Sequence, residues 1–195
     1  MHAPGTKEHY SSFAFVLASH LLVRVTGADG FEPALNTALG PWAAFRLDTP
    51  GGERAVPYIR AKDLPALPAK TAPEDILPSP LPPATCKYGG GGLMAGSSEL
   101  AQAGAMLASG RIIPKQKLKA ALKPWSEVSG IVYGGGVKAV RHGKQDVLSY
   151  SLSGGAPGGR SYLLVLIEPQ IAVAITGNID GPNLGDTALE IARLW

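Results

Sequence analysis

Apolar residues follow one another almost without interruption from Ser12 to Thr26, and this pattern predicts a helix over that range. Ser11 or Ser12 is the expected N-cap, because a serine hydroxyl there accepts a hydrogen bond from a free backbone N–H of the first turn. Gly27 is placed to end the helix in the left-handed conformation. The apolar residues occupy nearly the whole circumference, which indicates burial on several sides.

Helical spacing and end signals predict four more helices further along the chain. Ser97 or Ser98 is the expected N-cap of one of them, and Pro114 is the expected first residue of another. The last helix carries Trp195 on its apolar stripe. The predicted ranges are 31–39, about 98–110, 114–122 and 184–195.

Strand patterns dominate the last third of the chain. Segments 130–140 and 146–152 flank a predicted hairpin turn at Gly143, and segments 160–168 and 170–178 flank another at Pro169. The second pair is apolar almost throughout, which is typical of strands buried on both faces. Helices followed by an antiparallel sheet and a closing helix predict an α+β fold.

Residues 50–83 contain nine of the 17 prolines, so we expect an irregular surface excursion there, with local polyproline character. A proline-rich recognition peptide is the alternative. We treat residues 1–195 as one domain into which this excursion is inserted.

Composition excludes several classes of function. The net charge of +3 is small and the basic residues are scattered, so no nucleic-acid interface is expected. Cys86 is the single cysteine and the chain has four histidines, which leaves little scope for a metal site; we expect no metal and no cofactor. The apolar segment 13–25 is interrupted by His20 and Arg24 and is too short to span a membrane. No signal peptide is recognisable, which indicates a cytoplasmic chain as written.

Four short motifs follow one another along the chain, and their order is informative. They are "APGTKEHYSS" before the first helix, "GGGLMAGSSELA", "VYGGGV" and "LSGGAPGGRSYLLVLIEPQIAVAITGN". The ordered set resembles the serine β-lactamase-like hydrolases, above all class C β-lactamases, D,D-peptidases and related esterases. The resemblance implies an antiparallel sheet flanked by helices and acyl transfer on an ester or amide, such as a β-lactam, a D-amino-acid peptide or a carboxylic ester. Members of that family are often periplasmic or secreted, so the localisation stays open.

In that family a tyrosine at the start of a helix helps to activate the serine nucleophile, and Tyr10 and Ser12 match this element. The resemblance implies a catalytic role for Tyr10 and a hydrogen bond from Ser12 to the substrate or to a lysine. A phenol can act in this way only if a nearby ammonium lowers its pKa. The alternative is a packed aromatic residue beside a capped helix.

A second family element, Lys-Thr-Gly or His-x-Gly on an inner strand, falls on Leu152, Ser153 and Gly154. The resemblance implies that these residues line the substrate cleft and that the N–H of Gly155 is one arm of the oxyanion hole. Leu152 replaces the basic residue of the family. An apolar side chain neither polarises Tyr10 nor binds a carboxylate, which makes β-lactamase or D,D-peptidase action less credible than ester hydrolysis.

The family nucleophile lies in a Ser-x-x-Lys motif, and no serine of this chain has a lysine three residues later. We therefore expect the C-terminal portion of a β-lactamase-like domain, incomplete and inactive alone. A small acyl or peptide-like substrate would bind here, with the N-terminal half supplied by another chain or by oligomerisation. The alternative is a non-catalytic ligand-binding or interaction module derived from the same fold.

Other candidates have simpler explanations. His9 and His20 are expected to be structural, and His142 to be solvated in a turn. The glycine runs at 89–92 and 134–136 lack the Lys-Ser/Thr ending of a phosphate-binding loop.

Overall fold

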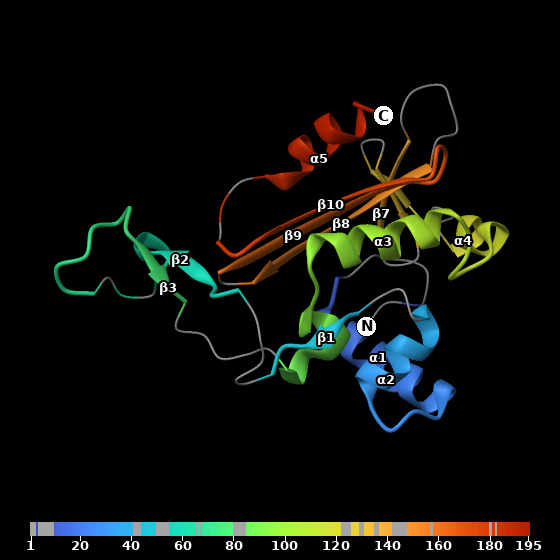
Figure 1. The fold of residues 1–195 in the computed structure, drawn as a ribbon, viewed down its shortest axis with the longest axis horizontal. Coiled ribbons are helices and arrows are strands. Elements are labelled where there is room, and N and C mark those ends of the chain that lie inside the picture. The colour runs from blue at the N-terminus through green and yellow to red at the C-terminus, as the bar shows by residue number, and fades with distance from the viewer. Residues whose placement is uncertain are drawn as a thin grey trace.

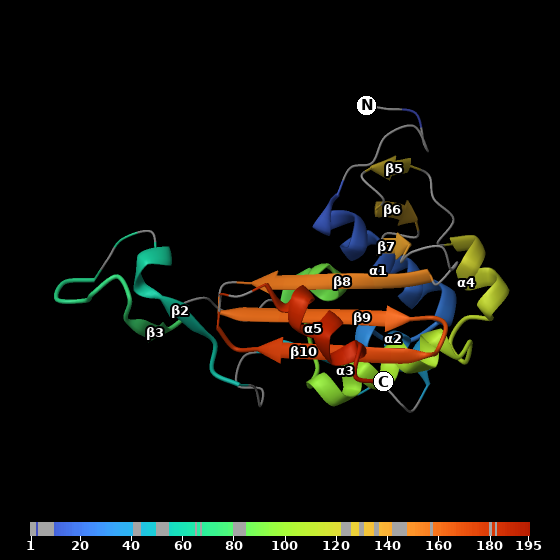
Figure 2. The same cartoon turned by 90° about the horizontal axis from the view of Figure 1, so that it is seen from above.

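A six-stranded antiparallel sheet, in the order β10-β9-β8-β7-β6-β5, forms the centre of the fold in the computed structural model (Figures 1 and 2). The structure describes residues 3, 10–40, 44–49, 55–64, 66, 68–79, 85–121, 126–128, 131–134, 137–141, 148–156, 158–179, 181 and 183–195. The strands of the sheet are β5 (Ser126–Val128), β6 (Ile131–Gly134), β7 (Val137–Arg141), β8 (Leu148–Ala156), β9 (Gly159–Leu166) and β10 (Ile171–Gly177).

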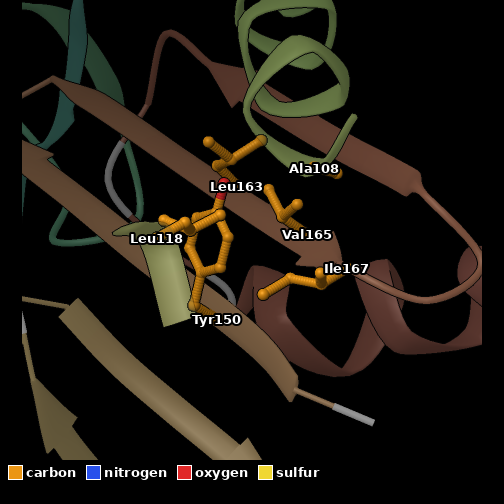
Figure 3. Packing of buried hydrophobic residues seen from close by; sticks show 6 residues of the cluster. All are labelled: Ala108, Leu118, Tyr150, Leu163, Val165 and Ile167. Carbon is orange, nitrogen blue, oxygen red and sulfur yellow. The ribbon is translucent and has the colours of Figure 1, made fainter. Parts of the chain in front are cut away.

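Both faces of the sheet are covered at β9 and β10. Helices α3 (Ser97–Ala108) and α4 (Lys115–Ala121) supply Ala108 and Leu118 to the core on one face, where Leu163 and Val165 are buried (Figure 3). Helix α5 (Leu184–Ala192) packs on the opposite face, over Leu164 and its neighbours. The prediction that this hairpin is buried on both sides, and the α+β fold class, are therefore confirmed.

Helices α1 (Ser12–Thr26) and α2 (Phe31–Leu39) have the predicted bounds. Ser11 caps α1 by accepting a hydrogen bond from Ala14 N, and Gly27 ends the helix at φ +67°. Figure 1 shows the pair on the same side of the sheet as α3. The expectation that α1 is buried on several sides is wrong, because Ser19 is its one buried residue.

The glycine run after Tyr88 allows a close approach between α1 and the 3₁₀ segment η2 (Thr85–Gly90). Ser19 Oγ donates to the carbonyl of Phe15 at 2.8 Å and accepts from Gly89 N at 3.0 Å. A Cβ added at Gly90 would lie 2.6 Å from the carbonyl oxygen of Ser12, closer than carbon and oxygen can approach. These glycines serve helix packing.

Regular structure occurs within the proline-rich excursion, which corrects the expectation of an irregular segment. Strands β2 (Tyr58–Arg60) and β3 (Ile76–Pro78) pair antiparallel, with the 3₁₀ turn η1 (Ala61–Asp63) after β2. A two-stranded sheet consists of edge strands alone, where proline is tolerated. Tyr58 N donates to the carbonyl of Asn178 at 2.7 Å, which fastens the base of this excursion to the end of β10.

Several element ends differ from the predictions. Segment 130–140 contains two strands, β6 and β7, and β5 was not expected; the predicted turn at Gly143 lies outside the described residues. Gly96, with no side-chain hydrogen bond, is the N-cap of α3, so Ser97 and Ser98 belong to its first turn. Pro114 precedes α4, and Trp195 lies beyond α5, exposed. A further small ladder joins β1 (Arg46–Leu47) to β4 (Leu93–Met94).

The apolar segment 13–25 was expected to be too short to span a membrane. Within the described ranges, no helix combines the length and apolar character that crossing a bilayer requires.

Candidate functional site: the open edge of β8

The register between β8 and β9 fixes which face each motif residue occupies. Leu152 pairs with Leu163 and Gly154 with Ser161, so by strand alternation both belong to the face covered by α3. Ser153 pairs with Tyr162 and belongs to the α5 face. Leu152 is 43 % exposed, although its partner Leu163 is buried, so this end of the face is exposed to solvent.

Strand β8 extends beyond its neighbour β7. The pairing of β7 with β8 runs from Arg141 and Leu148 to Lys138 and Ser151. On that side, residues 152–156 have no ladder partner among the described parts of the chain. Among the described residues, the second half of β8, which carries the Leu152-Ser153-Gly154 motif, is therefore an open strand edge.

The backbone amide of Gly155 is directed to this open edge. Ala156 pairs with Gly159 across a two-residue connection, and the pair that flanks such a turn is hydrogen-bonded. Because hydrogen-bonded and non-hydrogen-bonded pairs alternate along an antiparallel ladder, the amides of Gly155 and Ser153 point away from β9. The β6–β7 hairpin gives the same result. Its closing pair, Gly134 and Val137, is hydrogen-bonded, so Lys138 points its backbone groups toward β8 and pairs with Ser151, and the amides of Ser153 and Gly155 point to that same side of β8.

The two glycines leave room for their neighbours on β9. A Cβ at Gly154 would collide with Ser161 Oγ, and a Cβ at Gly155 would lie 2.9 Å from an Nη of Arg160. The Arg160 guanidinium therefore lies over the Gly155 backbone, on the face of the sheet that Ser153 shares. Sequence reasoning missed Arg160; the two-residue turn after Ala156 was the signal that would have placed it opposite Gly155.

Tyr10 and Ser12 lie together at the start of α1. The Ser12 hydroxyl donates to the Tyr10 hydroxyl at 3.5 Å, and the Tyr10 ring is 6.2 Å from the ring of Phe15. Tyr10 is 75 % exposed. Helix α1 lies on the same side of the sheet as α3, and thus on the side to which Leu152 and Gly154 belong (Figure 1). That Tyr10 and Gly154 line one cleft stays a prediction.

Of the four histidines, His20 lies within the described residues. His20 packs edge-on against Tyr88 with ring centroids 5.5 Å apart, as a structural histidine does. His9 and His142 lie outside the described residues. No group of three or more potential metal ligands occurs in the part of the chain that the structure describes.

Several solved structures have the same fold as this chain. The chain is similar to a D-stereospecific amidohydrolase from Streptomyces sp., with a TM-score of 0.72 and 21 % identity over 97 % of this chain and 55 % of that protein. It is similar to a penicillin-binding protein from Bacillus halodurans, with a TM-score of 0.75 and 16 % identity over 100 % of this chain and 58 % of that one. It is also similar to the octameric penicillin-binding protein homologue from Pyrococcus abyssi, with a TM-score of 0.74 and 19 % identity over 100 % and 44 %.

The chain thus spans about half the length of the structures that it resembles. A comparison with curated protein sequences gives no significant match. The family comparison matches the description "Beta-lactamase" over residues 1–194. This match covers nearly every residue, includes both motifs at Tyr10 and Leu152, and agrees with the shared fold. The chain belongs to the Beta-lactamase family.

Proposed function

We propose that this chain forms the acyl-binding part of a serine hydrolase that acts on an ester or amide. The observation that carries the proposal is the Gly155 amide, directed to the open edge of β8. A fixed N–H at such a position stabilises the negative oxygen of a tetrahedral intermediate and contributes roughly 10²–10³ in rate. The glycines at 154 and 155 leave the backbone bare, so that a substrate carbonyl can approach it.

A small D-amino-acid amide or a short peptide-like ester is the substrate class that this edge fits best. An open strand edge pairs with the main chain of an extended ligand, and the exposed Leu152 side chain offers it an apolar contact. Leu152 provides no cation to bind a carboxylate at that place. The similarity to a D-stereospecific amidohydrolase supports the amide class.

Tyr10 is the proposed proton carrier, and Ser12 is proposed to hold it in place. Their hydroxyl oxygens lie 3.5 Å apart at the N-terminus of α1, so a small movement of either side chain would form a short hydrogen bond. The phenol is exposed, so a substrate or a second polypeptide can reach it. In this proposal the Tyr10 oxygen takes the proton of the attacking hydroxyl and returns it to the leaving group.

The attacking serine and its lysine are proposed to come from polypeptide that corresponds to the uncovered part of the structural neighbours. No serine of this chain is followed by lysine at the third position. The chain covers 44–58 % of the three neighbours, so their additional length has room for such a motif. Oligomerisation is the other route by which a second polypeptide would reach the site.

A second candidate function is a non-catalytic ligand-binding module. Leu152 favours it, because an apolar residue replaces the base-polarising cation that the resemblance implies. Such a module would retain the β8 edge as a binding surface and would have no need for the Tyr10 phenol. The two functions therefore differ in their response to Tyr10→Phe.

Turnover measurements separate the two functions. The chain alone is expected to hydrolyse neither p-nitrophenyl acetate, nitrocefin nor D-phenylalanine amide above a heat-treated control, because loss of the nucleophile costs roughly 10⁶ in kcat. Adding the complementary polypeptide should create turnover that Tyr10→Phe lowers. Turnover by the chain alone that Tyr10→Phe abolishes would mean that a nucleophile is present here. A complex that binds D-phenylalanine amide but never turns it over favours the module.

A further inference from the structure

The proline-rich excursion packs against the turn that joins β8 to β9. Gly158 in that turn is buried, and its φ of +82° is a left-handed conformation that favours glycine. A Cβ added at Gly158 would lie 2.7 Å from Cβ of Pro57 and 3.0 Å from Cβ of Ser79. Because carbon atoms pack at about 3.5–4 Å, the missing side chain is what lets the excursion lie so close to the turn.

Hydrogen bonds fasten this part of the excursion to the end of β10. Tyr58 N donates to the carbonyl of Asn178 at 2.7 Å, and Asn178 Nδ2 donates to the carbonyl of Val56 at 2.9 Å. Ser79 N donates to the carbonyl of Pro57 at 2.8 Å, which joins the segment before β2 to the segment after β3. We call Val56, Pro57, Tyr58 and Ser79 the excursion base.

The turn lies at the end of the sheet that carries the open edge of β8. Figure 2 shows the excursion extending from that end, beyond β8, β9 and β10. Gly155 precedes Gly158 by three residues. Past Ser151, β8 has β9 as its ladder partner on one side and none on the other among the described residues. The position of this part of β8 therefore depends on β9 and on the contacts that hold the turn.

We propose that Pro57 and Ser79 are positioning residues, which hold the turn at Gly158 and thereby keep the Gly155 amide in place at the open edge. This role rests on the proposed function, in which that amide stabilises the acyl oxygen of the intermediate. A donor stabilises a developing charge only where it is fixed beforehand, and a displacement of about 1 Å can cost roughly 10²-fold in rate. Pro57 and Ser79 act through the backbone of the turn and need no contact with the substrate.

Pro57 is well suited to hold the turn. Its ring fixes its own φ, so the residue is rigid. Both of its neighbours, Val56 and Tyr58, are tied to Asn178, and its carbonyl accepts from Ser79 N. A rigid residue that is held on both sides gives the turn a fixed surface to pack against.

Amide hydrogen exchange in the ¹⁵N-labelled, ligand-free chain tests the positioning role. By the alternation along the ladder, Gly154 and Ser161 form a hydrogen-bonded pair, so their amides report whether this end of the hairpin stays closed. Pro57→Gly should accelerate their exchange about tenfold, because it removes the ring that lies against the turn. Ser79→Gly is the milder second variant, and circular dichroism checks that both variants fold.

Two controls separate this local effect from a general loss of stability. Pro68→Gly changes an exposed proline between β2 and β3 and increases the freedom of the unfolded chain in the same way, so exchange at the turn should stay as in the wild type. Tyr150 and Val165 form a hydrogen-bonded pair further along the same two strands. Their amides should exchange at the wild-type rate in Pro57→Gly.

The second measurement is the affinity for D-phenylalanine amide, followed through the shift of the Gly155 amide. Pro57→Gly should weaken binding about tenfold, and Pro68→Gly should leave it unchanged. If the wild type binds no ligand at Gly155 but the exchange results are as expected, the positioning role holds and the proposed function fails.

The opposite results overturn the positioning role and leave the proposed function standing. One is a ligand that binds to the wild type and to Pro57→Gly with equal affinity. Another is exchange at Gly154 and Ser161 that is unchanged in both Pro57→Gly and Ser79→Gly. The role is also overturned if Pro68→Gly accelerates this exchange equally, or if Tyr150 is accelerated as much as Gly154.

Discussion

The β9–β10 hairpin and helix α1 are the two most apolar parts of the chain, yet they differ in how they are covered. The hairpin has α3 on one face and α5 on the other, and the centre of β9 is fully buried. Helix α1 contacts α2 and η2 along one side and leaves Phe13, Leu17, Leu21 and Val25 exposed. The difference shows that apolar sequence predicts that a segment becomes covered, without saying which polypeptide covers it.

The largest expected effect contrasts one apolar side chain from each region. Ile167→Ala removes a side chain that is 1 % exposed and should lower the free energy of unfolding by about 2–5 kcal/mol. Leu21→Ala in the chain alone should change it by about 0.5 kcal/mol or less, since the side chain is mostly in water. Urea denaturation of both variants measures the difference. Equal losses would mean that α1 is covered as completely as the hairpin.

Close packing between α1 and η2 is the basis of the second prediction. Gly90→Ala forces a methyl group against the Ser12 carbonyl and should cost about 1–3 kcal/mol, with faster hydrogen exchange concentrated in α1. Gly177→Ala is the control, because nothing lies within 4 Å of its added Cβ. If both variants exchange like the wild type, the contact between α1 and η2 does not hold the helix.

A buried phenol in the sheet core gives the third prediction. Tyr150 Oη has no hydrogen-bond partner among the described residues, and burial raises the pKa of this phenol above its ordinary value (Figure 3). Tyr150→Phe removes the unsatisfied hydroxyl and should increase the free energy of unfolding by about 1 kcal/mol at pH 7. A loss of stability in the variant would reveal a partner for the hydroxyl.

The same phenol predicts a pH dependence. Above the ordinary tyrosine pKa of about 10, the unfolded chain releases this proton while the native state keeps it. The contribution of Tyr150 to the free energy of unfolding is therefore fully present below about pH 10, and it declines as the pH rises above that value. Denaturation curves between pH 8 and pH 11 should show a smaller decline for Tyr150→Phe than for the wild type.

The smallest expected effect concerns the two helix caps. Ser11→Ala removes the side chain that accepts from Ala14 N, and Asn183→Ala removes the one that accepts from Gly185 N. Each should cost about 1 kcal/mol of stability if the capped helix is needed for the folded state. In thermal unfolding, the Asn183 variant is expected to lose more, because α5 covers the sheet and α1 does not. The reverse order would indicate that α1 is the more tightly integrated helix.

Local chemistry predicted the helical elements well. Ser11 and Gly27 delimit α1 because a cap and a left-handed glycine act within a few residues of the chain. Pro169 correctly placed the β9–β10 hairpin. The pairing of β2 with β3 was not predicted, because it depends on contacts between segments that are distant in sequence. The start of α3 at Ser97 was not predicted either, because Gly96 is the N-cap without a side-chain hydrogen bond.

The candidate site was predictable only in part. The motif resemblance selected Tyr10, Ser12, Ser153, Gly154 and Gly155, and their catalytic and binding roles stay predictions. The direction of the Gly155 amide required the register of three strands, which no sequence pattern supplied. The exposure of α1 could not be predicted from the sequence either. An apolar helix sequence indicates that the helix becomes covered, but the extent of its burial depends on which other segments pack against it.

The open edge of β8 is proposed to bind the acyl group of a substrate. A titration of the ¹⁵N-labelled chain with D-phenylalanine amide, followed by NMR, is the decisive experiment. Saturable shifts of the Ser153 and Gly155 amides are expected, with no hydrolysis during the titration. Those shifts should be lost in Gly154→Val, whose side chain displaces Ser161 on β9. Gly177→Val, at the end of β10, should bind normally. Shifts confined to other parts of the chain, or none at millimolar ligand, would show that the substrate does not bind at this edge.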